Sequence, residues 1–182
     1  MDNSETQPQT LKGMDRLTLP DHARVWVYTA SRTLTSEERR CVLTALDAFT
    51  QSWVAHGQPL VAQSSVLLNQ VVVLALDESS QAATGCSIDS SVEAMRSLST
   101  VTKSLGDVDL LDRSWVLHLP SNADPVDVSS WRRERLHAFW AMRKAGTITD
   151  DVRIADTTVS TLGALRRSFV VTLGSSWHAH MW

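Results

Sequence analysis

Six consecutive apolar residues, from Val71 to Leu76, form the longest apolar stretch of this chain. Because every position is apolar, the stretch predicts a strand buried on both faces, as in the middle of a sheet. A second strand-like run, Leu60 to Leu68, precedes it, and Asn69-Gln70 joins the two. Asparagine tolerates left-handed backbone geometry, so this junction predicts a tight hairpin. We therefore expect a sheet built around a central β-hairpin.

A helix is predicted before this hairpin, because Thr35 and Glu38 have the spacing of a capping box. The threonine hydroxyl would accept from the third backbone N–H of the helix, and the glutamate would reach back to the cap. Gly57 and Pro59 end the helix, which places His56 on its last turn. The apolar face of this helix consists of Val42, Leu46, Phe49 and Trp53.

Three further elements complete the first part of the chain. The β-rich run Val25–Tyr28 precedes the first helix. A second helix is predicted to start at Ser90, which has capping-box spacing to Glu93, and to end at Gly106. Trp115–Leu119 is the next strand. The order is the βαββαβ pattern of a ferredoxin-like sandwich, so the expected fold class is α+β.

Three segments are expected along the chain. Residues 1–21 mix polar residues and proline without a period, which is typical of a disordered leader. Residues 22–120 form the ferredoxin-like core. Residues 121–182 form a C-terminal β-α-β lobe, whose helix begins at Ser129 or Ser130, and the Trp/His tail packs on the core.

Composition limits the partners of this chain. The net charge of −3 argues against nucleic-acid binding, which depends on neutralising phosphates. The first twenty residues lack the apolar centre of a signal peptide, and the longest apolar stretch is too short to span a bilayer. We therefore expect a soluble cytoplasmic protein that binds neither nucleic acid nor membrane.

The segment Gly85–Ser91 contains the residue of greatest chemical interest, Cys86. A helix that begins a few residues later supplies free backbone N–H groups and the positive end of the helix dipole. A thiol in this setting can become nucleophilic. His56 or His178 would take its proton, and Asp89 would orient the histidine. The alternative is a structural cysteine in a loop that leads into a helix.

The expected binding residues lie in the same places. Packing is the alternative role for Trp177, and helix capping is the alternative for His56. No closely spaced ligand pair such as CxxC or HExxH is present, so neither a metal nor another cofactor is expected. The binding residues are Trp53, Gly57, Gly85, Ser87, Ser90 and Trp177.

Three segments, Trp53–Leu60, Gly85–Ser91 and Ser176–His178, carry a resemblance to a known family. They resemble an uncharacterised bacterial family common in Bacteroidetes, whose members often carry the label "ABC transporter ATPase". The resemblance covers most of residues 24–180. The chain has no GxxxxGK[ST] phosphate loop, so ATP hydrolysis by the P-loop route is not expected. The resemblance implies no particular activity, but it points to the segments already chosen on chemical grounds.

Residues 113–155 carry a second likeness. A Trp-led strand, the segment Val126–Ser129, a helix and the segment Gly146–Val152 follow one another there. This order is similar to the GYF-like module of bacterial proteins. The resemblance implies a β-α-β shape and peptide binding.

Two functions remain open. In the first, Cys86 attacks an acyl or amide group of a small molecule, and backbone N–H groups of the second helix hold the developing oxyanion. The first function requires Cys86 and a histidine ring within about 4 Å of each other, lining one open cleft. In the second, the protein binds a peptide or a second copy of itself without catalysis, which predicts a buried Cys86 and an exposed apolar patch elsewhere. The tryptophans expected on that patch include Trp131, Trp140 and Trp182.

Overall fold

The computed structural model describes residues 10–181 and contains both helices and antiparallel sheets, so the predicted α+β class is confirmed. The first part consists of β1 (Arg24–Thr29), α1 (Ser36–Ser52), β2 (Val54–Ala55), β3 (Gln58–Pro59), β4 (Val61–Leu67), β5 (Val71–Asp77) and α2 (Gly85–Gly106). The second part consists of β6 (Trp115–Leu119), β7 (Arg132–Arg135), α3 (Leu136–Lys144), β8 (Arg153–Ala155), α4 (Leu162–Ser168) and β9 (Val170–Thr172). Short 3-10 helices are η1 (Met14–Arg16), η2 (Val128–Ser130), η3 (Leu173–Ser175) and η4 (Trp177–His180).

The first sheet is antiparallel and has the strand order β1-β5-β4. As predicted, the apolar run from Val71 is the central strand, and its residues are completely buried up to Leu76. The predicted hairpin is also confirmed, because Leu67 pairs with Val71 across a short turn. Two residues of this turn, Leu68 and Asn69, have positive φ angles of 53° and 54°.

The strand Trp115–Leu119 departs from the ferredoxin-like expectation. It was expected to complete the first sheet, but β6 lies in a second sheet with the order β7-β6-β8-β9. The reason is an unpredicted strand, β7, which pairs with β6 over four residues. Sequence patterning assigned this stretch to a helix. As a consequence, β1 is an edge strand of the first sheet.

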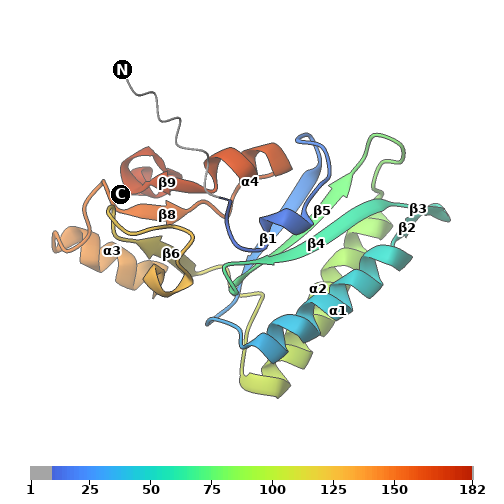
Figure 1. Ribbon diagram of the computed structural model, residues 1–182, viewed down its shortest axis with the longest axis horizontal. Helices are drawn as coiled ribbons and strands as arrows, with labels where there is room; N and C mark the ends of the chain where they lie inside the picture. Colours follow the sequence, from blue (N-terminus) through green and yellow to red (C-terminus); the bar gives the residue numbers. More distant parts are fainter. Residues whose placement is uncertain (1–9, 182) are drawn as a thin grey trace.

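Helices α1 and α2 lie side by side along one face of the first sheet (Figure 1). α1 begins at the predicted capping box, in which the Glu38 backbone N–H donates to Thr35 Oγ1 at 3.2 Å. The predicted start of α2 at Ser90 is wrong. Thr84 and Ser87 form the capping box instead, and the helix begins at Gly85. A serine hydroxyl here takes the role in which a sequence pattern looks for Glu or Gln.

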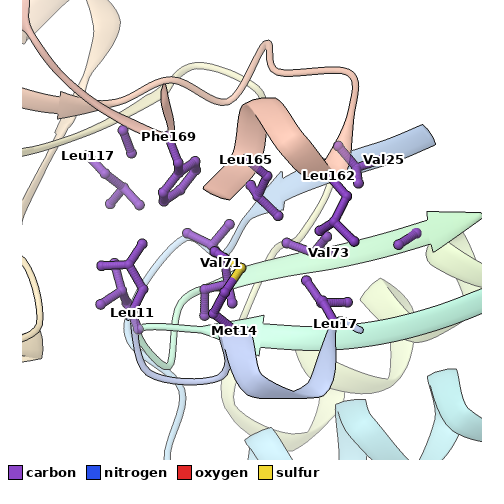
Figure 2. Packing of buried hydrophobic residues seen from close by; sticks show 14 of the residues in the cluster. Leu11, Met14, Leu17, Val25, Val71, Val73, Leu117, Leu162, Leu165 and Phe169 are labelled. Atoms are coloured by element: carbon purple, nitrogen blue, oxygen red, sulfur yellow. The ribbon is translucent and has the colours of Figure 1, made fainter. Parts of the chain in front are cut away.

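The expectation of a loose leader does not hold for residues 10–21, while residues 1–9 lie outside the described part of the chain. Figure 2 shows Leu11, Met14 and Leu17 packed toward the sheet residues Val71 and Val73. Gly13 permits this approach: its φ is 94°, and a Cβ there would lie 2.4 Å from the Val66 carbonyl oxygen. Leu11, Met14 and Leu17 recur every three residues, and this apolar spacing could have indicated in the sequence that the segment packs on the core.

One hydrophobic cluster contains residues of both expected domains. Helix α4 and the following residue, Phe169, pack against the first sheet from the same side as the N-terminal segment (Figure 2). Strand β6 also contributes to this core through Leu117 and Leu119. The second sheet is therefore joined to the first by apolar packing, and the place beside β1 is left to loops.

Candidate functional site

A cleft of about 450 Å³ lies between the end of α1 and the start of α2, and we call it the cysteine cleft. Trp53 fixes its geometry, because this side chain is 2% exposed and its indole N–H donates to the Ser87 carbonyl at 2.8 Å. Ser90 Oγ donates to the same carbonyl at 2.7 Å. The cleft is lined by Phe49, Ser52, Trp53, Val54, His56, Thr84, Gly85, Cys86, Ser87 and Ser90.

His56 reaches this cleft from a hairpin and not, as predicted, from the last turn of a helix. α1 ends at Ser52, and the strands β2 and β3 follow with Ala55 paired to Gln58. The two residues of the turn, His56 and Gly57, have φ angles of 50° and 75°. Two positive φ angles are typical of a type I′ hairpin turn, which favours glycine at its second position.

Cys86 is exposed, so the buried cysteine expected for a binding protein is not observed. It is the second residue of α2 and lies among the N–H groups of the first turn. Among the residues expected to act with it, only His56 lines the same cleft. Asp89 is exposed on α2 and does not line the cleft. His178 is buried in η4, where its ring stacks on Trp177 with 3.9 Å between centroids. The structure therefore unites two of the four predicted catalytic residues.

A second cleft, of about 510 Å³, runs along β1, and we call it the edge cleft. Its walls come from segments that are far apart in the sequence, and sequence reasoning missed it except for Trp177. The cleft exists because β6 pairs in the second sheet, so that no strand lies on the outer edge of β1. Only the pairing of the strands could have indicated it. The lining consists of residues 24–29, Leu110, Asp112, Arg113, Trp115, residues 157–160 and Trp177.

One edge of β1 faces the segment that follows residue 156, but only the start of the strand is paired with it. The Val25 N–H donates to the Ser160 carbonyl at 3.0 Å, and the Leu162 N–H donates to the Ala23 carbonyl at 2.8 Å. Outward-directed groups alternate along an edge strand, so the next ones belong to Val25, Val27 and Thr29. Within residues 10–181, no hydrogen bond is made by the Val25 carbonyl, by either Val27 group or by the Thr29 N–H.

The charges in the edge cleft are unbalanced. Hydrogen bonds from the Ser114 side chain and backbone, together with the nearby Arg135, lower the pKa of Asp112 to about 2. Arg135 forms an ion pair with Asp112, so that carboxylate is already compensated. Arg24 lies 4.6 Å from the Trp26 ring centroid, and Arg113 is exposed. In the described part of the chain, neither of these two arginines forms an ion pair.

The tryptophans divide into packing residues and cleft residues. Trp131, expected on the surface, is 7% exposed, and its indole N–H donates to the Pro125 carbonyl. Trp140 contacts Lys144, whose amino group lies 3.6 Å from the ring centroid, and Trp182 lies outside the described residues. In the edge cleft, Trp177 is 40% exposed, and the Trp115 Nε1 is buried without a partner among residues 10–181.

Among residues 10–181, no group of three or more His, Cys, Asp or Glu side chains is placed to hold a metal ion. No helix in this part of the chain combines the length and apolar character needed to cross a membrane. No family model, curated protein or solved structure matches this chain, so the family resemblance of the three segments stays a prediction.

Proposed function

We propose that this protein binds an extended peptide segment, which adds a strand to β1 in the edge cleft. One observation carries the proposal: unpaired backbone groups of an edge strand line a cleft. Backbone N–H and C=O groups need partners, and strand addition supplies main-chain partners in sequence. A peptide of about five extended residues, roughly 17 Å long, matches the length of the free edge.

The other walls of the cleft suit the same ligand. The Trp115 side chain is partly exposed and lines the cleft, so its ring can contact the side chains of a peptide. Trp177 offers a large, partly exposed apolar surface. Tryptophans of this kind often anchor bound peptides. The proposed ligand therefore gains backbone pairing from β1 and side-chain contacts from the opposite wall.

A selection of random 12-residue peptides displayed on phage tests this function. The strongest binders are then synthesised with N-methyl groups on alternate residues, in two complementary sets. In an added strand only one set of N–H groups faces β1, so one set should weaken binding about tenfold or more and the other should be tolerated. The proposal fails if no peptide is enriched, or if both sets bind equally well.

A protein variant provides a second arm of the same test. Val27→Pro removes the N–H in the middle of the free edge, and edge strands tolerate proline better than central strands do. Val27→Ala is the matched control, because it shortens the side chain and keeps the N–H. Selected peptides should bind the alanine variant and lose affinity for the proline variant, with circular dichroism used to verify that both are folded.

The second candidate function is thiol chemistry in the cysteine cleft. It is favoured by the position of Cys86, which is exposed in the first turn of a 22-residue helix and shares a cleft with His56. The Cys86 sulfur would attack an acyl carbonyl while His56 takes the thiol proton, and the leaving group would depart with that proton.

Alkylation by iodoacetamide at neutral pH tests this candidate, in a Cys41→Ala background so that Cys86 is the only thiol. An activated thiol reacts at least about tenfold faster than free cysteine. His56→Gln should remove the excess rate, whereas His22→Gln, at an exposed histidine outside the cleft, should not. A rate equal to that of free cysteine would eliminate thiol catalysis and leave peptide binding as the function.

A further inference from the structure

We infer that the segment bound in the edge cleft is acidic, with carboxylate side chains that pair with Arg24 and Arg113. This inference rests on the proposed function and specifies its ligand class. The occupant is a segment of another protein, recognised by its backbone and by its negative charge.

The charged residues that line the edge cleft provide the first argument for an acidic ligand. Arg24 and Arg113 line the cleft without an ion-pair partner in the described chain, and the only lining carboxylate, Asp112, is paired with Arg135. This local excess of positive charge occurs in a chain whose net charge is −3. A bound carboxylate would therefore find two uncompensated guanidinium groups, which bind carboxylates in a bidentate geometry.

The positions of the two cations in the chain provide the second argument. Arg24 is the first residue of β1, and Arg113 belongs to the segment between α2 and β6. Both line the cleft, so its positive charge comes from two separate segments. A ligand strand on β1 would therefore meet a cation from its pairing strand and a second one from another wall.

A second copy of the chain is a poorer occupant. Pairing of β1 with β1 about a two-fold axis would bring Arg24 and Arg113 of both copies into one region. Like charges directly across a strand pair are destabilising. The wall formed by residues 157–160 also pairs with the start of β1, so only part of the edge is free. A short acidic segment avoids the charge repulsion, and about five extended residues fit the free part of the edge.

The test uses the same random 12-residue phage library on the full-length chain and on two variants. One carries Arg24→Gln and Arg113→Gln, and the other, Arg40→Gln, removes an exposed arginine of α1 outside the cleft. Peptides selected on the unmodified protein and on Arg40→Gln should be enriched in Glu and Asp. The double variant should bind these peptides about tenfold more weakly.

A measurement on the unmodified protein keeps the test independent of any folding defect. Exchanging the Glu residues of a selected peptide for Gln should weaken binding about tenfold, and raising the salt from 50 to 500 mM should weaken only the acidic form. Enriched peptides without acidic residues, or equal binding by the Gln form, would overturn the inference and leave strand addition standing. Failure to enrich any peptide would instead overturn the proposed function. If the unmodified protein forms a concentration-dependent dimer and Val27→Pro does not, the occupant of the edge is a second copy of the chain, which overturns the inference.

Discussion

The cysteine cleft and the edge cleft differ in how completely their polar groups are paired. In the cysteine cleft, the Trp53 indole and the hydroxyls of Thr84, Ser87 and Ser90 all have protein partners. In the edge cleft, the outward-directed backbone groups of Val27 have none within residues 10–181. Because buried polar groups are normally paired in folded proteins, unpaired groups indicate where a ligand can bind. The hydroxyls of the cysteine cleft stabilise the start of α2, and the Trp53 indole joins that helix to the end of α1.

The largest effect expected concerns Trp53, which joins α1 to α2. It is 2% exposed and packs on Phe49 and Trp26 at centroid distances of 5.1 and 6.0 Å. Trp53→Ala should therefore lower the free energy of unfolding by about 3–5 kcal/mol in urea titrations. Trp177→Ala, at a 40% exposed residue of the edge cleft, should cost far less. Equal losses would mean that both clefts are structural.

Acid should weaken the lobe that carries the edge-cleft wall. Burial lowers the pKa of His118 in β6 to about 4, and its Nε2 lacks a partner among the described residues. The unfolded chain takes up this proton near the ordinary value of 6.5. The stabilising effect of the neutral ring is therefore complete above pH 6.5 and is lost as the pH falls, by about 3 kcal/mol at pH 4.

The check is to compare unfolding free energies at pH 7 and pH 4 for two variants. His118→Leu should reduce the difference between the two pH values by about that amount, and His137→Gln, at an exposed histidine of α3, should leave it unchanged. Burial also lowers the pKa of His178, so part of the acid sensitivity should persist. If the unfolding free energies of His118→Leu at pH 7 and pH 4 differ as much as those of the unmodified protein, protonation of His118 does not cause the loss of stability in acid.

The smallest effect concerns the capping boxes. Thr84→Ala and Thr35→Ala remove equivalent caps from α2 and α1, and each should cost about 1 kcal/mol of stability. Only Thr84 lies beside Cys86, so only its loss should change the rate of Cys86 alkylation in the Cys41→Ala background. If both variants alter that rate equally, the alkylation rate of Cys86 depends on the overall stability of the fold and not on the local structure at the start of α2.

The sequence predicts elements well where a local pattern decides them. The run of apolar residues from Val71 and the capping box at Thr35 each specify one element, and both are observed. The start of α2 was placed too late because Ser87 replaces the expected glutamate in the box. β7 was missed because the stretch Arg132–Arg135 has no apolar alternation and is extended through its pairing with β6.

The candidate sites show the same limit. Cys86 and His56 could be chosen by chemistry, and they line one cleft because a hairpin, absent from the prediction, carries His56 there. The edge cleft could not be found, since no residue of β1 indicates that its neighbouring place in the sheet is empty. Edge status is a property of topology, and it follows from the pairing of β6 with β7 and β8.

Amide hydrogen exchange of Val27 and Thr29 tests the central claim most directly, with a selected acidic peptide added to the unmodified protein. If the peptide forms a strand on β1, the Val27 and Thr29 amides should exchange at least about tenfold more slowly in the complex, because their N–H groups become hydrogen-bonded. Amides near Cys86 should keep their rates. Unchanged exchange at Val27 and Thr29 under saturating peptide would contradict strand addition.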